Sequence, residues 1–113
     1  MAATANLTID QGATFSTDIT VKDNAGDALD LTDYTAEAKM ALGFSSTRTR
    51  VALTTAFATD RTTGGITISL TADQTKTLEA PARYVYDVEI TSADSTITRV
   101  IEGIITVNPS ITT

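Results

Sequence analysis

The chain has 113 residues, enough for one domain that buries its own core without disulfides or metals. It contains no cysteine and no histidine, which removes disulfide frameworks, thiolate and imidazole chemistry, and the commonest zinc ligands. Its formal net charge of -6 repels phosphate backbones and anionic lipid, so we expect neither nucleic acid nor a membrane as a partner.

The hydrophobic fraction is 42%, but much of it is alanine, and threonine is the dominant polar residue. Alanine buries little area, and threonine favours strands through its branched Cβ. The composition therefore indicates an all-β protein with a thin core. A thin core makes association with other protein chains plausible.

The first half of the chain opens with a predicted tail and two strands. Residues 1–5 are small and polar and are predicted to be a frayed tail. Apolar and polar residues alternate over residues 7–10 and again over residues 15–21, which predicts strands with one solvent-exposed face. Residues 23–27 are rich in types that tolerate a positive φ, so we expect the chain to reverse there.

The aspartates of this turn also invite a calcium-binding interpretation. An EF-hand loop needs a glycine at its sixth position and a glutamate at its twelfth. Counted from Asp23, the glycine comes too early, at Gly26, and Tyr34 occupies the closing position. We therefore favour a turn-forming role over metal binding, and we expect no metal or other cofactor.

A third strand and an exposed loop follow. Alternation over residues 34–42 predicts the strand, and the polar stretch of residues 43–50 predicts a loop that carries Phe44, Arg48 and Arg50. Aromatic residues and arginine concentrate binding energy in protein interfaces, so these three residues are candidate contacts. The alternative is that Phe44 folds back onto the core.

Two hairpins are predicted in the second half. The first joins residues 51–59 to residues 66–70 through a turn with two adjacent glycines. The second joins residues 84–90 to residues 97–107 through the polar turn 92–95, whose short side chains can bond their own backbone. Its first strand alternates apolar residues with carboxylates, which is the clearest one-sided strand pattern in the chain.

One short helical turn is predicted between the hairpins, over residues 71–79. Thr71 followed three residues later by Gln74 is a capping-box pattern, and Pro81 ends the turn. After the last strand a proline leaves the ladder, so residues 109–113 are predicted to be a second tail.

Seven or eight short strands with turn signals between them predict a single domain over residues 1–113. We expect an all-β fold, an immunoglobulin-like two-sheet antiparallel β-sandwich with one short helical turn. Asp87 and Glu89 lie on one strand face and point into solvent, whereas a carboxylate pair for glycoside hydrolysis faces across a cleft. No serine has a histidine partner, so we expect no enzymatic activity.

The last strand has apolar residues on both faces. If its other isoleucines face the core, Val100 and Ile104 point outward beside Val85 and form an apolar strip on a face that should be polar. Either another segment of this chain or another subunit covers the strip. Gly103 could mark a bulge, which would change the residues that face inward and would shorten the strip.

Several phrases between Leu7 and Val107 resemble one protein family. They include LDLTDYT at residues 29–35, ARYVYDVEI at residues 82–90 and TRVIEGIITV at residues 98–107. These phrases are similar to the N-terminal domain of baseplate upper proteins of tailed bacteriophages and to small virion structural proteins of cyanophages. The resemblance implies an immunoglobulin-like β-sandwich that holds its neighbours in a phage particle by surface contact, and it implies no catalytic residues.

We therefore expect a non-enzymatic structural or assembly component of a bacteriophage virion, in the tail or baseplate region. Its expected partners are other virion proteins and copies of itself. The N-terminus, MAATANLT, lacks the basic and apolar regions of a signal peptide, so we expect synthesis in the host cytoplasm. The alternatives are a capsid decoration protein and a carbohydrate- or host-surface-binding module, for which Phe44 is the main free aromatic side chain.

Overall fold

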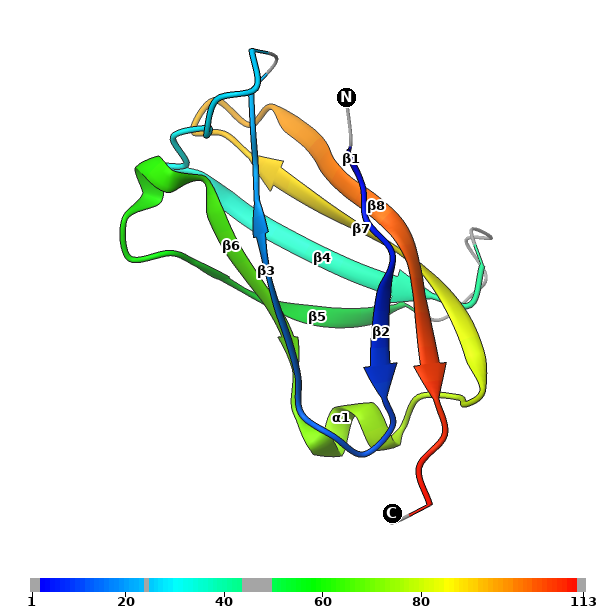
Figure 1. The fold of residues 1–113 in the computed structure, drawn as a ribbon. Coiled ribbons are helices and arrows are strands. Elements are labelled where there is room, and N and C mark those ends of the chain that lie inside the picture. The colour runs from blue at the N-terminus through cyan, green and yellow to red at the C-terminus, as the bar shows by residue number, and fades with distance from the viewer. Residues whose placement is uncertain (1–2, 24, 44–49, 112–113) are drawn as a thin grey trace.

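The computed structural model describes residues 3–23, 25–43 and 50–111. These residues form eight strands, a five-residue α-helix and one 3-10 turn (Figure 1). The strands are β1 (Ala3–Thr4), β2 (Leu7–Asp10), β3 (Phe15–Thr20), β4 (Thr35–Ala41), β5 (Val51–Phe57), β6 (Gly65–Leu70), β7 (Ala82–Thr91) and β8 (Ile97–Asn108). The helix α1 spans Ala72–Lys76, and the 3-10 turn η1 spans Arg61–Thr63. The prediction of a β protein with one short helix is confirmed; the sequence did not predict η1.

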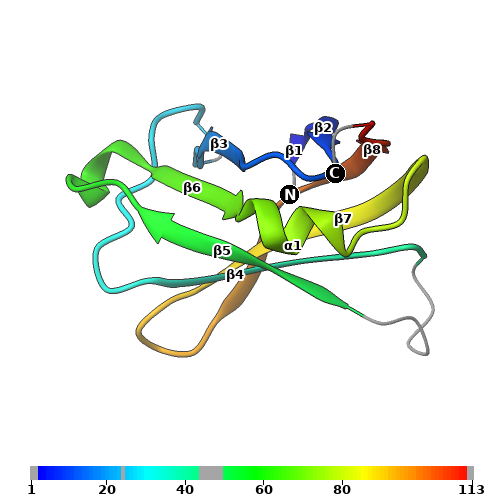
Figure 2. The same cartoon turned by 90° about the horizontal axis from the view of Figure 1, so that it is seen from below.

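All eight strands belong to one mixed sheet with the order β1-β8-β7-β4-β5-β6-β3, and β2 also pairs with β8. The first half of β5 pairs with β4 and its second half pairs with β6. β5 therefore joins the group of β4, β7 and β8 to the group of β6 and β3. The sheet curls, with β3, β2 and β8 lying over β6, β5 and β4 in the view of Figure 2. β1 and β2 run parallel to β8, so the prediction of a purely antiparallel arrangement is wrong.

The core fills the concave inner face of this curled sheet. Alternate residues of every long strand point inward, as the pleat requires, and the two-residue period of the sequence predicted most of them. The largest fully buried apolar side chains come from β2, β4, β6, β7, β8 and the segment before β4: Ile9, Leu31, Met40, Ile66, Ile68, Leu70, Val88, Ile90, Ile105 and Val107. Core residues therefore come from both ends of the chain.

The N-terminal arm lies against β8 and is not a tail. β1 pairs with β8, and the Ala5 N–H donates to the Glu102 carbonyl at 2.9 Å. The Tyr86 hydroxyl donates to the Ala5 carbonyl at 2.6 Å, and burial raises the pKa of this phenol above its ordinary value, which keeps it a neutral donor. The tail predicted for residues 1–5 is therefore wrong for residues 3–5.

Gly103 makes room for this arm. A Cβ at position 103 would lie 2.1 Å from the Ala5 carbonyl oxygen, far inside van der Waals contact. Gly103 itself pairs regularly with Tyr86, and the irregularity of the β7–β8 ladder lies between Val88 and Glu89. The prediction of a bulge at Gly103 is therefore wrong, and the glycine is present because the arm approaches closely.

We expect Gly103→Ala to displace the arm. The two atoms that the added methyl group would meet within 3 Å belong to the Ala5 backbone, so the free energy of unfolding should fall by about 1–3 kcal/mol, the usual cost of overpacking. Urea denaturation measures the loss, and hydrogen exchange at the Ala5 amide reports the arm directly. Gly65→Ala is the control, because its added Cβ would meet the Ala58 side chain at 3.1 Å, well away from the arm. Unchanged stability with a protected Ala5 amide would contradict this account.

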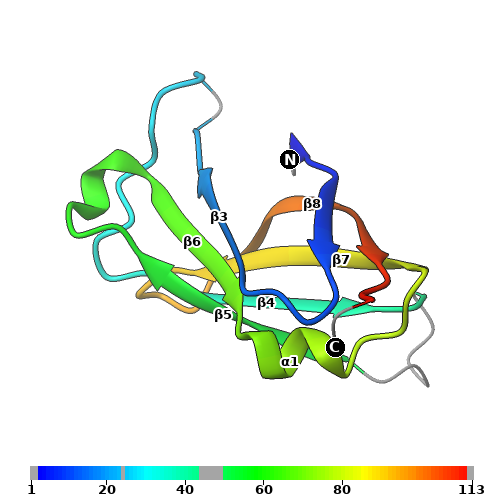
Figure 3. The same ribbon diagram turned by 60° about the horizontal axis from the view of Figure 1, so that its bottom comes forward.

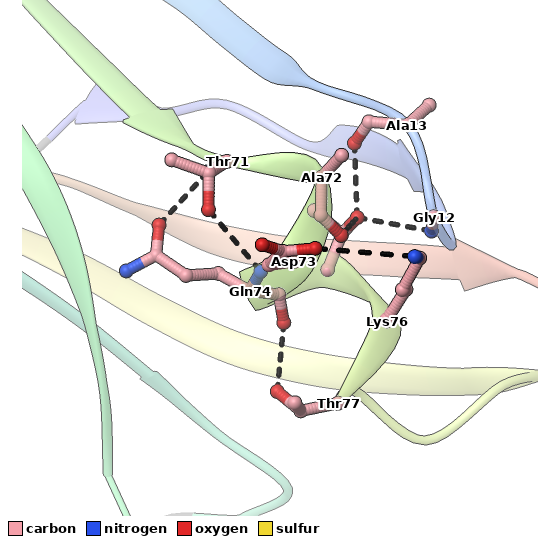
Figure 4. A network of polar contacts seen from close by, with 9 residues as sticks. Gly12, Ala13, Thr71, Ala72, Asp73, Gln74, Lys76 and Thr77 are labelled. Atoms are coloured by element: carbon pink, nitrogen blue, oxygen red, sulfur yellow. Dashed lines mark hydrogen bonds and ion pairs between the residues drawn. The ribbon is translucent and has the colours of Figure 1, made fainter.

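The capping box predicted for the helix is confirmed (Figure 4). The Gln74 N–H donates to the Thr71 hydroxyl at 3.2 Å, and the Thr71 N–H donates to the Gln74 side-chain oxygen at 2.8 Å. The helix ends at Lys76, earlier than the predicted residue 79. Leu78 follows the helix and is buried in the core. The capping box therefore stabilises the start of this segment, and Leu78 fixes its end to the core.

Thr75 of α1 holds the loop that joins β2 to β3. Its hydroxyl is fully buried and accepts the Gly12 N–H at 2.9 Å. The same oxygen lies 2.9 Å from the Ala13 carbonyl and 3.0 Å from the Ala72 carbonyl, to which its proton can be donated. Figure 4 shows Gly12 and Ala13 beside the helix. One side chain therefore satisfies backbone groups of two segments more than sixty residues apart.

We expect Thr75→Val to lower the free energy of unfolding by about 1–3 kcal/mol, because the isosteric side chain leaves buried backbone groups of the loop without a partner. Thr77→Val is the matched control. The Thr77 hydroxyl is exposed and bonds only the Gln74 carbonyl of its own helix, at 2.7 Å, so its loss should cost less than about 0.5 kcal/mol. Chemical denaturation of both variants checks the difference, and equal losses would contradict the role given to Thr75.

Candidate functional site

The face of β4, β7 and β8 that points away from the core carries a distinctive set of side chains, which we call the outer face. Its members alternate along each strand with buried residues. They are Glu37, Lys39, Ala41, Val85, Asp87, Glu89, Arg99, Glu102 and Ile104. An apolar row and two charged rows cross the three strands.

The apolar row consists of Ala41, Val85 and Ile104, which lie directly opposite one another in the ladder. Ala41 is only 2% exposed, Val85 is half-buried, and Ile104 is 39% exposed. The Ile104 N–H donates to the Asn6 side chain at 3.1 Å, so the N-terminal arm borders the row at its far end. The row therefore places an exposed apolar centre on a sheet face that is otherwise polar.

The charged rows carry more carboxylates than cations. Lys39 and Glu37 form an ion pair at 2.9 Å, and Arg99 and Asp87 form another at 3.3 Å. Glu102 lies directly opposite Asp87, which places like charges on neighbouring strands.

Glu89 lies directly opposite Glu37, which places a second pair of like charges on neighbouring strands. Among the residues that the structure describes, Glu89 and Glu102 have no ion pair. The exposed pairs stabilise the fold little, but the two uncompensated carboxylates give the outer face a negative surplus.

The structure brings part of the predicted interface together. Arg50 is exposed, donates from Nη1 to the Gly43 carbonyl at 3.1 Å, and lines one groove of about 150 Å³ with Val85, Lys39 and Asp87. Phe44 and Arg48 lie outside the described residues, and nothing tests their predicted contacts.

The strip predicted from Val85, Val100 and Ile104 does not form as one surface. Val85 and Ile104 are opposite each other on the outer face. Val100 is skipped by the register shift, because Val88 pairs with Ile101 and Glu89 pairs with Arg99. Its side chain packs against the core, so this member of the predicted strip is corrected.

The loops at one end of the sheet contain aspartates that stabilise turns. Asp30 accepts the amide and the hydroxyl of Thr32 at 3.0 and 2.6 Å, and Asp60 makes the same two contacts with Thr62 at 3.0 and 2.6 Å. These hydrogen bonds, the hydroxyl first, lower the pKa of both carboxyl groups. The Ser92 hydroxyl and then Thr96 lower the pKa of Asp94 in the last turn. The sequence contained this signal as an aspartate two residues before a threonine.

Asp23 has the turn-forming role that was favoured for it. Its carboxylate accepts the N–H groups of Ala25 and Asp27 at 2.9 and 3.0 Å. Within residues 3–23, 25–43 and 50–111, no group of three or more histidine, cysteine, aspartate or glutamate side chains is placed to hold a metal ion. In the same ranges, no helix is long and apolar enough to cross a membrane.

Comparisons with known proteins give likenesses to solved structures only. No family model and no curated protein matches the chain. A solved structure of an internalin-like protein from Listeria monocytogenes matches with a TM-score of 0.47 and 17% sequence identity. The match covers 95% of this chain and 28% of the Listeria protein, so the chain spans little more than a quarter of that protein.

Proposed function

We propose that this protein is a non-enzymatic structural component of a bacteriophage virion, in the tail or baseplate region, that acts through protein-protein contacts. The observation that carries the proposal is the apolar pair of Val85 and Ile104 on the outer face, with Arg50 in the groove beside Val85. Two of the phrases that resemble phage virion proteins, ARYVYDVEI and TRVIEGIITV, form β7 and β8, the strands that present this pair.

The pattern of strand pairing supports an immunoglobulin-like topology, which is part of the proposal. The β3–β6 pair corresponds to the B and E strands of that fold, and β4, β7 and β8 correspond to C, F and G. In this topology β3 and β6 form one layer and β4, β7 and β8 form the other. β5 belongs to both layers, since it changes partner between β4 and β6. The N-terminal strands close the layer formed by β4, β7 and β8 along β8.

The chemistry of the outer face describes the partner surface. Interfaces have an apolar centre inside a polar rim, and Val85 and Ile104 supply such a centre. The rows beside it carry four carboxylates against Lys39 and Arg99, with Arg50 in the groove, so the rim is of mixed charge with a small negative surplus. A complementary partner therefore presents an apolar patch with a mainly basic edge. The patch is small, and symmetric repetition in a particle would multiply the strength of a weak contact.

We expect the double variant Val85→Asp, Ile104→Asp to reduce incorporation into particles by about tenfold or more, because buried charges replace the apolar centre of the contact. Both side chains point away from the core, so circular dichroism and the melting temperature should change little. Incorporation is measured by quantitative mass spectrometry of purified particles.

Ile97→Asp is the matched control for this experiment. Ile97 also lies on β8 and is 64% exposed, but it pairs with Thr91 near the hairpin turn, away from the apolar row. The control should enter particles normally. Normal incorporation of the double variant would exclude the outer face as the contact. Imaging particles with the labelled protein distinguishes a tail position from a decoration protein on the capsid.

One observation favours the alternative of a carbohydrate-binding module. Tyr34 lines a shallow groove of about 570 Å³ at the loop end of the molecule, together with Asp33, Asp94 and several threonines. An aromatic ring beside carboxylates suits a sugar, which stacks on the ring and donates hydroxyls. This alternative predicts a glycan-array signal that falls by about tenfold in Tyr34→Leu, with Asp73→Asn on the distant helix as the control. An array without signal would exclude it.

A further inference from the structure

The strand β3 has an open edge. It pairs with β6 over six residues without a register shift, and within the described part of the chain no strand lies on its other side. The Val21 N–H donates to the Gly64 carbonyl, which continues the same ladder. Backbone groups of an antiparallel strand alternate in direction, so the N–H and C=O groups of Ser16, Asp18 and Thr20 point away from β6.

The strand β2 has a second open edge that faces the first. The amides of Ala5 and Gln11 donate to carbonyls of the β8 chain, which places the odd-numbered residues of this arm toward β8. By the same alternation, the backbone groups of Thr8 and Asp10 point away from β8. β2 and β3 run in opposite directions, and no other element lies between them in Figure 1 or Figure 3.

Two grooves follow the space between these edges. One of about 360 Å³ is lined by Leu7 and Thr8 of the arm and by Phe15 and Thr17 of β3, among others. The other, of about 480 Å³, continues from Thr20 toward a more apolar wall. The first is lined by residues 14–17 and the second by residues 20–23, and the segment 14–23 spans roughly 30 Å of extended backbone. This length accommodates a complete strand.

The apolar wall of the second groove includes Val100. Because of the bulge in the β7–β8 ladder, Val100 turns from the outer face to this groove, which Leu29 and Tyr34 also line. An occupant of the groove would therefore cover an apolar residue for which the sequence predicted a cover, either another segment of this chain or another subunit.

The β3 edge has few of the devices that prevent strand addition. Proteins protect such edges with charged side chains, above all lysine, with proline, or with a bulge, and the one charged residue of β3 is Asp18. β3 has the sequence FSTDIT, which contains neither proline nor lysine, and its ladder has no irregularity. Lys22 follows only after the strand has ended.

The charges beside the β3 edge favour a basic occupant. Asp10 lines the first groove, Lys22 and Asp23 line the second, and Asp18 lies on β3 itself, so carboxylates outnumber lysine. Asp18 accepts a hydrogen bond from the Thr67 hydroxyl at 2.6 Å, and Asp10 accepts one from the Asn108 side chain at 3.3 Å. Within the described part of the chain, neither carboxylate has an ion pair. Neutral donors satisfy some of their lone pairs and leave both negative charges uncompensated.

We propose that the open edge of β3 accepts an extended, basic segment of another protein as an added strand. Its main chain pairs with Ser16, Asp18 and Thr20, its lysine or arginine side chains meet Asp10 and Asp18, and its apolar side chains cover Val100. This is strand addition to a sheet edge, in which backbone bonds supply affinity and side chains supply specificity. A second copy of this chain is a poorer occupant, because each copy carries a net charge of -6. The inference does not depend on the proposed virion role.

The test uses two capped peptides of about nine residues, roughly the length of the grooves at 3.3 Å per residue. One peptide alternates lysine with valine, and the other alternates glutamate with valine. We expect the lysine peptide to bind at least about tenfold more tightly and to slow hydrogen exchange at the amides of Ser16, Asp18 and Thr20. Equal binding of the two peptides, or no binding of either, would overturn the proposal.

Proline substitution separates edge pairing from binding elsewhere. Ser16→Pro removes an N–H that points to the open edge and leaves the β3–β6 bonds in place, so lysine-peptide affinity should fall about tenfold. Ser16→Ala keeps the N–H and should bind as the unmodified protein does.

Thr20→Pro repeats the test if Ser16→Pro does not fold by circular dichroism. Undiminished binding to a folded proline variant would contradict pairing at this edge. Slow exchange of the same amides in the protein alone, with a dimer mass by light scattering, would assign the edge to a second copy and would also overturn the proposal.

Discussion

The fold depends on one strand that changes its neighbour along its length. β5 pairs with β4 through its first residues and with β6 through its last, so two antiparallel groups become one sheet. A sheet with one apolar face can bury that face against itself only by curling. The change of partner along β5 lets the sheet curl, so that β3 lies over β5 and β4 in the view of Figure 2. The inner face then closes into the core, and the outer face of β4, β7 and β8 remains available for contact.

Two polar contacts fix the positions of the N-terminal arm and of the loop between β2 and β3. The Thr75 hydroxyl holds the loop between β2 and β3, and the Tyr86 hydroxyl holds the N-terminal arm at Ala5, above the space left by Gly103. Apolar packing alone would tolerate several positions of so short an arm. A buried hydroxyl with satisfied partners accepts one position, because any other leaves polar groups without hydrogen bonds.

The sequence predicted features that are local and missed those that depend on distant segments. The alternation of β3, β4 and β7 and the Thr71–Gln74 capping box are encoded within a few residues, and each was found where it was expected. The parallel pairing of β2 with β8 joins residues about one hundred positions apart, and no local pattern carries it. Val100 was placed on the wrong face because a two-residue period assumes an uninterrupted ladder, and nothing in residue 100 itself signals the bulge. Val85 and Ile104 lie on one side of that bulge and kept the predicted face.

The negative surplus on both candidate surfaces constrains what can bind there. In a two-fold contact the same patch meets itself, so an association through Val85 and Ile104 would bring Glu102 of each copy toward carboxylates of the other. A head-to-tail arrangement of copies, or a different protein with a basic rim, avoids that repulsion. The open β3 edge leads to the same conclusion through Asp10 and Asp18. An apolar pair can then supply affinity while the surrounding carboxylates select the partner, which makes the negative charge of this small domain a determinant of specificity.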